Sequence, residues 1–235
     1  MSGWAAKRFW QAAQAEPCDA GFTVRLDARP VKTPAKRPLV LPTLAMAQAI
    51  AAEWDQQQGL IRPDTMPLTR AANSAIDKVA PQVDAVVDEI ANYGTTDLLC
   101  YRATDPQPLV DRQAAQWTPL LDWARDALNA PLVVTQGVIP VPQPSQCLTC
   151  LRGHVAAYSP FQLAALHDLV AISGSLILGL AVARQRLTGE QGFGLSRIDE
   201  DWQSALWGED ETAAAQEVLR RDAFLRSERF FTLCG

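Results

Sequence analysis

The sequence has few of the residues and motifs on which enzymes depend. It holds two histidines and no G-x-S-x-G motif, which leaves little room for a catalytic triad. A phosphate-binding loop of the form G-x-x-x-x-G-K-S/T is also absent. Gly192-Phe193-Gly194 has the spacing that opens a dinucleotide-binding fingerprint, but no strand is predicted before it and no third glycine follows. We therefore expect a protein that is not an enzyme and that uses no cofactor.

An excess of positive charge is also missing. Lysine and arginine together number 21, whereas aspartate and glutamate number 26, so the formal net charge is -5 at pH 7. Proteins that bind nucleic acid need a basic surface to neutralise phosphates. We therefore expect no nucleic-acid partner.

No apolar run is long enough to predict a transmembrane helix. The longest apolar one reaches from Leu169 to Ala183, short of the ~20 residues that a bilayer requires. The first eight residues lack the apolar region of a signal peptide and the long Arg/Ser-rich extension of a transit peptide. The five cysteines, an odd number, are then expected to be reduced thiols. These features predict no membrane insertion and a cytoplasmic, bacterial protein.

The most apolar part of the chain, from Ser159 to Gly189, is predicted to form one long buried helix. Ser159 suits the N-cap, Pro160 the first helical position, and Gln162 completes a capping box. Gly189 suits the C-terminal cap. Apolar side chains point almost all round this helix, so other helices are expected to surround it.

Short strands are predicted in the first 42 residues. Residues 22–26 alternate between apolar and polar side chains, two more short runs follow, and Thr43 can cap a covering helix. The later segments have helical spacing. We therefore expect an α+β fold with a small strand-rich domain and its covering helix at residues 1–66. A mainly α-helical bundle domain around the long buried helix is expected at residues 67–235.

One group of residues suggests a metal site. Thiolate and imidazole are the ligands that zinc prefers, and the chain offers Cys147, Cys150, His154 and His167. On a helix, however, Cys147 and Cys150 are simply neighbours, and cysteine is among the most buried residue types. A zinc-stabilised domain or metal-dependent enzyme is therefore the alternative function.

Acidic residues and tryptophans gather near the C-terminus. Asp199-Glu200-Asp201-Trp202 begins a predicted helix that Ser196 can cap and that runs to Trp207. Gly208 can end this helix, and Glu209-Asp210-Glu211 begins the last one. Carboxylates favour the first turn of a helix, which offers a structural explanation. Carboxylate pairs also serve acid–base chemistry or cation binding. Tryptophans beside exposed acids are equally typical of a protein-binding surface.

Several segments together resemble one family, in the same order and over nearly the whole length. They are Leu26–Pro34, Ala52–Asp55, Met66–Asp77, Thr96–Arg102 and Asp199–Gly208. The chain resembles the Atp-twelve-type assembly chaperones of F-type ATP synthase. It departs from them in the Gly192–Gly194 segment, where a more helical, alanine-rich sequence is expected, and we expect these glycines to weaken any helix.

The resemblance implies a chaperone that binds the free alpha subunit of the catalytic sector. The chaperone shields the surface that alpha later presents to the beta subunit, needs no cofactor or metal, and is a monomer when free. Bacterial members act in the cytoplasm and eukaryotic relatives in the mitochondrial matrix. The resemblance assigns partner binding to Asp199 and Glu200. Neighbouring residues complete the expected site: Asp201, Trp202, Trp207 and Glu209.

Overall fold

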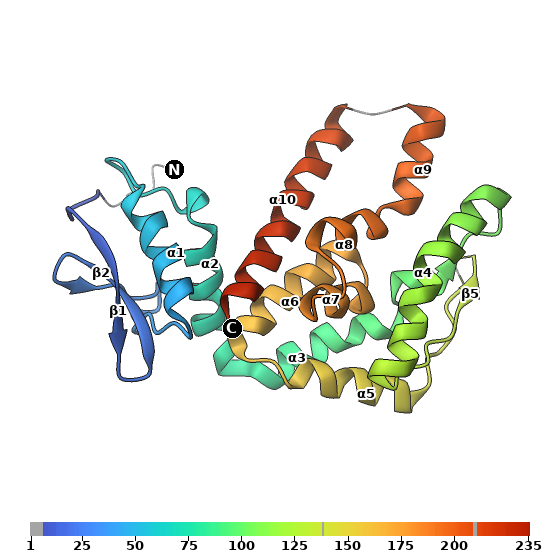
Figure 1. Cartoon of the computed structure of the whole chain (residues 1–235), viewed down its shortest axis with the longest axis horizontal. Coiled ribbons are helices and arrows are strands. Elements are labelled where there is room, and N and C mark those ends of the chain that lie inside the picture. Colours follow the sequence, from blue (N-terminus) through green and yellow to red (C-terminus); the bar gives the residue numbers. More distant parts are fainter. Residues whose placement is uncertain (1–6, 138, 209–210) are drawn as a thin grey trace. The chain divides into compact units, whose positions relative to one another are not determined.

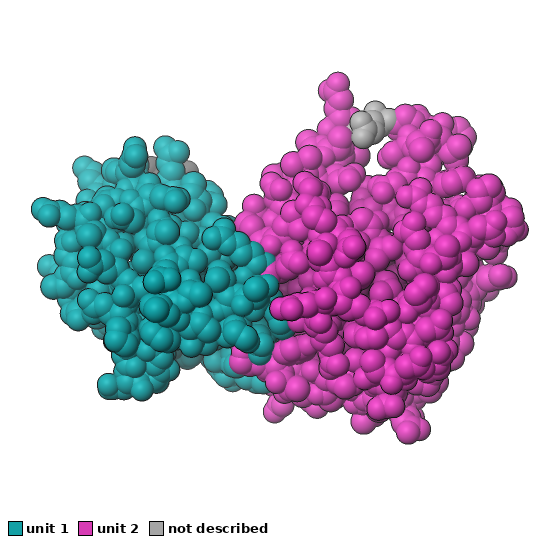
Figure 2. Space-filling model, viewed as in Figure 1, with its two compact units in different colours: residues 1–83, 160–164, 229–235 teal, residues 84–159, 165–228 magenta. Residues whose placement is uncertain are grey.

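The computed structural model describes residues 7–137, 139–208 and 211–235, and it has the predicted α+β class (Figure 1). The chain forms two compact units (Figure 2). Unit 1 contains residues 1–83, 160–164 and 229–235, and unit 2 contains residues 84–159 and 165–228. The α6 and α10 helices each contribute residues to both units. The domain boundary at residue 66 stays a prediction.

Unit 1 is built on a small antiparallel sheet and the helix beside it. The sheet has the order β1 (Ala13–Cys18), β2 (Gly21–Leu26) and β3 (Arg29–Pro30). The side chain of Thr43 accepts a hydrogen bond from the Met46 backbone N–H at 3.1 Å, so Thr43 caps helix α1 (Leu44–Asp55) as predicted. Alternate residues of β2 are buried with α1, which gives this unit its apolar core.

A buried carboxylate joins α1 to the next helix. Glu53 on α1 accepts hydrogen bonds from the backbone N–H groups of Leu68 and Thr69 at 2.7 and 2.8 Å. It also accepts one from the Thr69 hydroxyl at 2.7 Å. These groups lie in the first turn of α2 (Pro67–Ser74), where backbone N–H groups have no partner within the helix. Two of the segments behind the resemblance, around Glu53 and around Leu68, therefore meet for a structural reason.

Replacing Glu53 with glutamine should lower the free energy of unfolding by about 2 kcal/mol. The amide keeps one acceptor oxygen but brings an N–H₂ donor toward the α2 donors and removes the charge at the helix N-terminus. Urea denaturation measures the loss. Glu16→Gln is the control, because Glu16 forms only a half-exposed ion pair with Arg25 at 3.3 Å. An equal, small effect at both positions would show that the Glu53 carboxylate is not holding α2.

Unit 2 is mainly helical. Short helical turns and a two-stranded parallel sheet connect its longer helices. In chain order the elements after α2 are η2 (Ala75–Val79), η3 (Ala80–Gln82), α3 (Val83–Asn92), η4 (Tyr93–Thr95), η5 (Leu98–Cys100), β4 (Tyr101–Arg102), α4 (Gln107–Leu128), β5 (Thr135–Gln136), α5 (Ser145–Ala156), α6 (Pro160–Ser173), α7 (Leu176–Ala183), α8 (Gly189–Ser196), α9 (Ile198–Trp207) and α10 (Glu211–Leu233). Before α2 lies a short turn, η1 (Pro63–Thr65).

The long buried helix predicted from Ser159 to Gly189 is wrong, because α6 and α7 are separate helices. Gly174 has a φ of +69°, a conformation that ends a helix and that glycine adopts at little cost. Ser175 then caps α7 by accepting a hydrogen bond from the Leu178 N–H at 3.0 Å. The prediction of a buried, apolar segment holds for α7, whose seven residues Leu176–Val182 are buried.

The glycines that follow α7 also behave differently from the expectation. Gly189 begins α8 instead of ending the preceding helix, and its N–H donates to the Glu228 carboxylate at 2.6 Å. Thr188 and Gln191 form a capping box. A Cβ on Gly192 would lie 2.6 Å from Val182 Cγ2, so glycine permits close packing there. Capping and packing together offset the low helix propensity of glycine.

No helix in the described ranges is both long and apolar enough to span a bilayer.

Candidate functional site

The predicted site lies at the start of α9, but the helix is capped differently from the expectation. The residue at the N-cap is Arg197, not Ser196. Ser196 belongs to the end of α8, where its hydroxyl donates to the Phe193 carbonyl at 2.7 Å. The prediction that Ser196 caps this helix is therefore wrong. Asp199, Glu200 and Asp201 do lie in the first turn of α9, as predicted.

Arg197 organises the carboxylates around it. Its guanidinium lies 3.3 Å from Glu200 Oε1 and 3.8 Å from Asp201 Oδ1 on α9. It also binds Glu217 Oε2 on α10 at 2.9 Å. Only 12% of the Arg197 side chain is exposed. The mostly buried guanidinium therefore links α9 to α10 and partly neutralises the acidic group.

Burial raises the pKa of Asp201 above its usual value. The nearby Glu217 carboxylate raises this pKa further, while Arg197 and Arg112 lower it. Because Asp201 is half-buried and Glu200 is exposed, Glu200 is the better placed of the two to meet a protein partner.

The contacts of Asp199 indicate a structural role, in contrast to Glu200. It accepts a hydrogen bond from Gln113 Nε2 on α4 at 2.5 Å, and Gln113 is only 1% exposed. The Gln113 amide oxygen accepts the Ala103 N–H at 2.8 Å, and the Gln113 carbonyl accepts Arg102 Nη1 at 3.0 Å. These contacts fix the Gln113 side chain on α4, and its hydrogen bond to Asp199 therefore holds α9 against α4. The Asp199 carboxylate is thus part of a partly buried polar network.

Trp207 is the most exposed of the large apolar side chains in the described ranges, at 87%. It follows Glu200 by seven residues, so both lie on one face of α9, about 10 Å apart along its axis. Trp202 is half-buried, and its indole N–H is buried without a hydrogen-bond partner in the described ranges. The site thus combines an exposed acid with an exposed aromatic ring. Glu209, the remaining predicted residue, lies outside the described residues.

The analysis of the sequence missed several residues of this region. Arg197 was detectable, because it precedes Glu200 by three positions and Asp201 by four, the spacing of helical ion pairs. Gln113 lies 86 positions before Asp199 in the sequence, and no local pattern announces their contact. The exposure of three apolar residues was also missed: Leu206, Val218 and Leu219.

The four residues of the alternative zinc site do not come together. His154 accepts a hydrogen bond from Arg184 on Nδ1 at 2.8 Å, because a guanidinium can only donate. Its Nε2 therefore carries the proton and donates to the Leu128 carbonyl at 3.1 Å. His167 lies instead beside Asp168, at 3.1 Å. No group of three or more histidine, cysteine and acidic residues in the described ranges could hold a metal ion, so the prediction of a zinc site is wrong.

The segment Thr96–Arg102 contains a second carboxylate of interest. Asp97 is fully buried and accepts hydrogen bonds from the Leu99 N–H, the Ser175 hydroxyl and the Ile177 N–H at 3.0, 2.7 and 3.0 Å. Burial raises its pKa from 3.8 to about 6, although these hydrogen bonds lower it. Asp97 therefore fixes the break between α6 and α7 and is not available to a partner.

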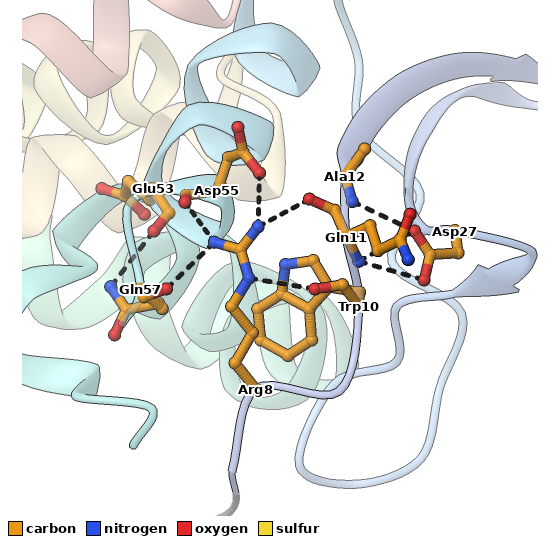
Figure 3. A network of polar contacts seen from close by, with 8 residues as sticks. All are labelled: Arg8, Trp10, Gln11, Ala12, Asp27, Glu53, Asp55 and Gln57. Atoms are coloured by element: carbon orange, nitrogen blue, oxygen red, sulfur yellow. Dashed lines mark hydrogen bonds and ion pairs between the residues drawn. The ribbon is translucent and has the colours of Figure 1, made fainter. Parts of the chain in front are cut away.

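Polar contacts in unit 1 are structural as well (Figure 3). Arg8 forms an ion pair with Asp55 at 3.0 Å and donates to the carbonyls of Trp10, Gln11 and Gln57 at 3.0, 2.7 and 3.0 Å. Asp27 accepts the N–H groups of the segment that leads into β1. These contacts fasten the described N-terminal segment to α1 and to the sheet.

Comparisons with known proteins agree on one family. A family model described as "ATP12 chaperone protein" matches residues 7–125. The curated "Protein atp12, mitochondrial" of Schizosaccharomyces pombe is 22% identical over 219 residues, which cover 88% of this chain and 75% of that protein.

Solved structures extend the likeness to the whole fold. The crystal structure of Atp12 from Paracoccus denitrificans is 54% identical, with a TM-score of 0.96, and covers 99% of this chain and 100% of that one. The Atu1473 protein from Agrobacterium tumefaciens is 40% identical, with a TM-score of 0.90, over 96% of this chain and 84% of that one.

Proposed function

Because this chain belongs to the ATP12 chaperone family, we propose that it is an assembly factor of F-type ATP synthase that binds the free alpha subunit. It shields the surface that alpha later presents to the beta subunit, and beta displaces it when the catalytic sector forms. It acts in the bacterial cytoplasm, is a monomer when free, and performs no catalysis.

The physical requirement for such a protein is clear. An unassembled subunit exposes a large apolar interface, and such a surface aggregates unless it is covered. The covering protein must bind well enough to protect the subunit and weakly enough to be exchanged. A stoichiometric complex without turnover meets both conditions.

The proposal for the binding site rests on two exposed side chains of α9, Glu200 and Trp207. Tryptophan is the residue type most enriched where protein interfaces gain their binding energy, and Trp207 offers nearly its whole ring. Glu200 on the same face supplies a charge that steers a basic partner. We assign contact with alpha to Glu200 and Trp207, with Asp201 and Trp202 beside them. Asp199 holds α9 in place.

Co-expression with the cognate alpha subunit tests the function directly. We expect the two proteins to elute together in size-exclusion chromatography, and the complex to dissociate when beta is added, because beta competes for the covered surface. Alpha expressed alone should aggregate more than alpha co-expressed with this chain. If alpha elutes separately or aggregates whether or not this chain is present, the proposed function is wrong.

A further inference from the structure

The first half of α10 is mostly exposed. Among residues 211–222 only Ala214 and Glu217 are partly buried, and all others are exposed. In Figure 1 this half of α10 and the end of α9 extend beyond the other helices of unit 2. We call residues 198–207 and 211–222 the α9–α10 arm. The second half of α10 differs, because Phe224 and Phe230 are buried.

The arm exposes large apolar side chains that no packing within the described chain explains. Leu206 is 61% exposed, Val218 58% and Leu219 66%, in addition to Trp207. They are four of the ten large apolar side chains that are exposed in the described ranges, on little more than 20 residues. Clustered exposed apolar residues mark a binding surface, whereas isolated ones need no explanation.

The charge of the arm indicates what covers it. In the described ranges the arm contains two basic residues, Arg220 and Arg221, and six acidic ones: Asp199, Glu200, Asp201, Glu211, Glu217 and Asp222. Both arginines are already engaged, because Arg220 donates to the Ile172 carbonyl and Arg221 pairs with Glu190. Arg197 borders this segment but is already paired with Glu200 and Glu217. The excess of carboxylates would repel an acidic partner surface, whereas it would attract lysine and arginine side chains placed around an apolar centre.

We propose that the α9–α10 arm docks onto an apolar patch of the alpha subunit bordered by lysine and arginine side chains. Leu206, Trp207, Val218 and Leu219 form the apolar contact, and the surrounding carboxylates pair with the basic border. This inference rests on the proposed function and adds α10 to the site. It follows that binding has an apolar part insensitive to salt and an ionic part that salt weakens.

The double variant Val218→Ser/Leu219→Ser in the full chain tests the apolar part. We expect its affinity for purified alpha, measured by titration calorimetry, to fall by more than about tenfold. The thermal unfolding midpoint should not change, because both side chains are exposed in the free protein. The matched control is Ile139→Ser, at a residue that is 74% exposed but lies outside the arm. It should bind as the unaltered chain does.

Raising the salt concentration from about 50 mM to about 500 mM tests the ionic part. Affinity should fall for the unaltered chain and for the double variant in similar proportion, because neither serine replacement touches a carboxylate. An affinity independent of salt would contradict the basic border.

The remaining outcomes separate the two proposals. If the unaltered chain does not bind alpha, the proposed function and this inference both fail. If it binds alpha and the double variant binds equally well, the function stands and the docking arm is wrong. If the chain alone forms a dimer by light scattering and the double variant does not, the arm covers a second copy and not alpha.

Discussion

Replacing Asp97 with alanine is expected to lower the free energy of unfolding by about 4 kcal/mol, because three buried donors lose their acceptor at once. The donors are the Leu99 N–H, the Ser175 hydroxyl and the Ile177 N–H. Each unpaired buried donor costs about 1–3 kcal/mol, and removing a desolvated carboxylate offsets part of the sum. Denaturant unfolding followed by circular dichroism measures the loss.

Asp88→Ala is the matched control for this replacement. Asp88 is an exposed carboxylate on α3 that pairs with Arg152 at 2.6 Å, and exposed pairs contribute less than about 1 kcal/mol. If Asp97→Ala costs no more than Asp88→Ala, the buried carboxylate does not stabilise the break between α6 and α7.

The same carboxyl should make stability depend on pH. Burial raises the pKa of Asp97 in the folded protein to about 6, from 3.8. A carboxyl with a raised pKa contributes most stability below its unfolded pKa, and this contribution is lost as pH rises through about 6. On going from about pH 7 to about pH 5 the unaltered chain should therefore gain about 1 kcal/mol relative to Asp97→Asn. An equal pH dependence of the two proteins would assign the change to other groups.

The sequence predicted those parts of the fold that depend on neighbouring residues. The strand β2 and the Thr43 cap follow from patterns within a few positions, and both were confirmed. The break after Ser173 was missed although Gly174 and Ser175 are a helix stop followed by an N-cap. The apolar periodicity of the segment favoured one continuous helix over these two signals. Asp97, whose buried carboxylate stabilises the break, lies 78 positions before Ser175, so no local pattern indicates their contact.

In the candidate site, too, local sequence patterns predict some features, and only the fold shows the others. Its position in the first turn of a helix follows from composition and capping preferences, and the high exposure of Trp207 agrees with a binding surface. The different roles of Asp199 and Glu200 do not follow, because adjacent acids in a sequence look equivalent. Only the fold places Gln113 beside one of them. The assignment of partner binding stays a prediction, which a pair of charge reversals can test.

Glu200→Lys should reduce affinity for the alpha subunit by about a hundredfold while leaving the protein folded. The exposed carboxylate would be replaced by a cation facing the proposed basic border, and like charges across an interface cost several kcal/mol. In the free protein the change places a cation beside the mostly buried Arg197, which keeps its pair with Glu217, so the cost should be about 1 kcal/mol. Calorimetric titration and thermal unfolding measure the two effects separately.

Asp199→Lys should behave differently, although it changes the charge by the same amount. The buried Gln113 amide would lose its acceptor and face a cation, so α9 should detach from α4 and stability should fall by about 2 kcal/mol. Asp199→Asn keeps an acceptor oxygen and should retain most of both stability and binding. Glu89→Lys is the control for charge reversal, because Glu89 is exposed on α3 and lies outside the α9–α10 arm. If Glu89→Lys weakens the complex as much as Glu200→Lys, binding responds to net charge alone. If Asp199→Lys is as stable as the unaltered chain yet does not bind, Asp199 contacts the partner directly and the division of roles on α9 is wrong.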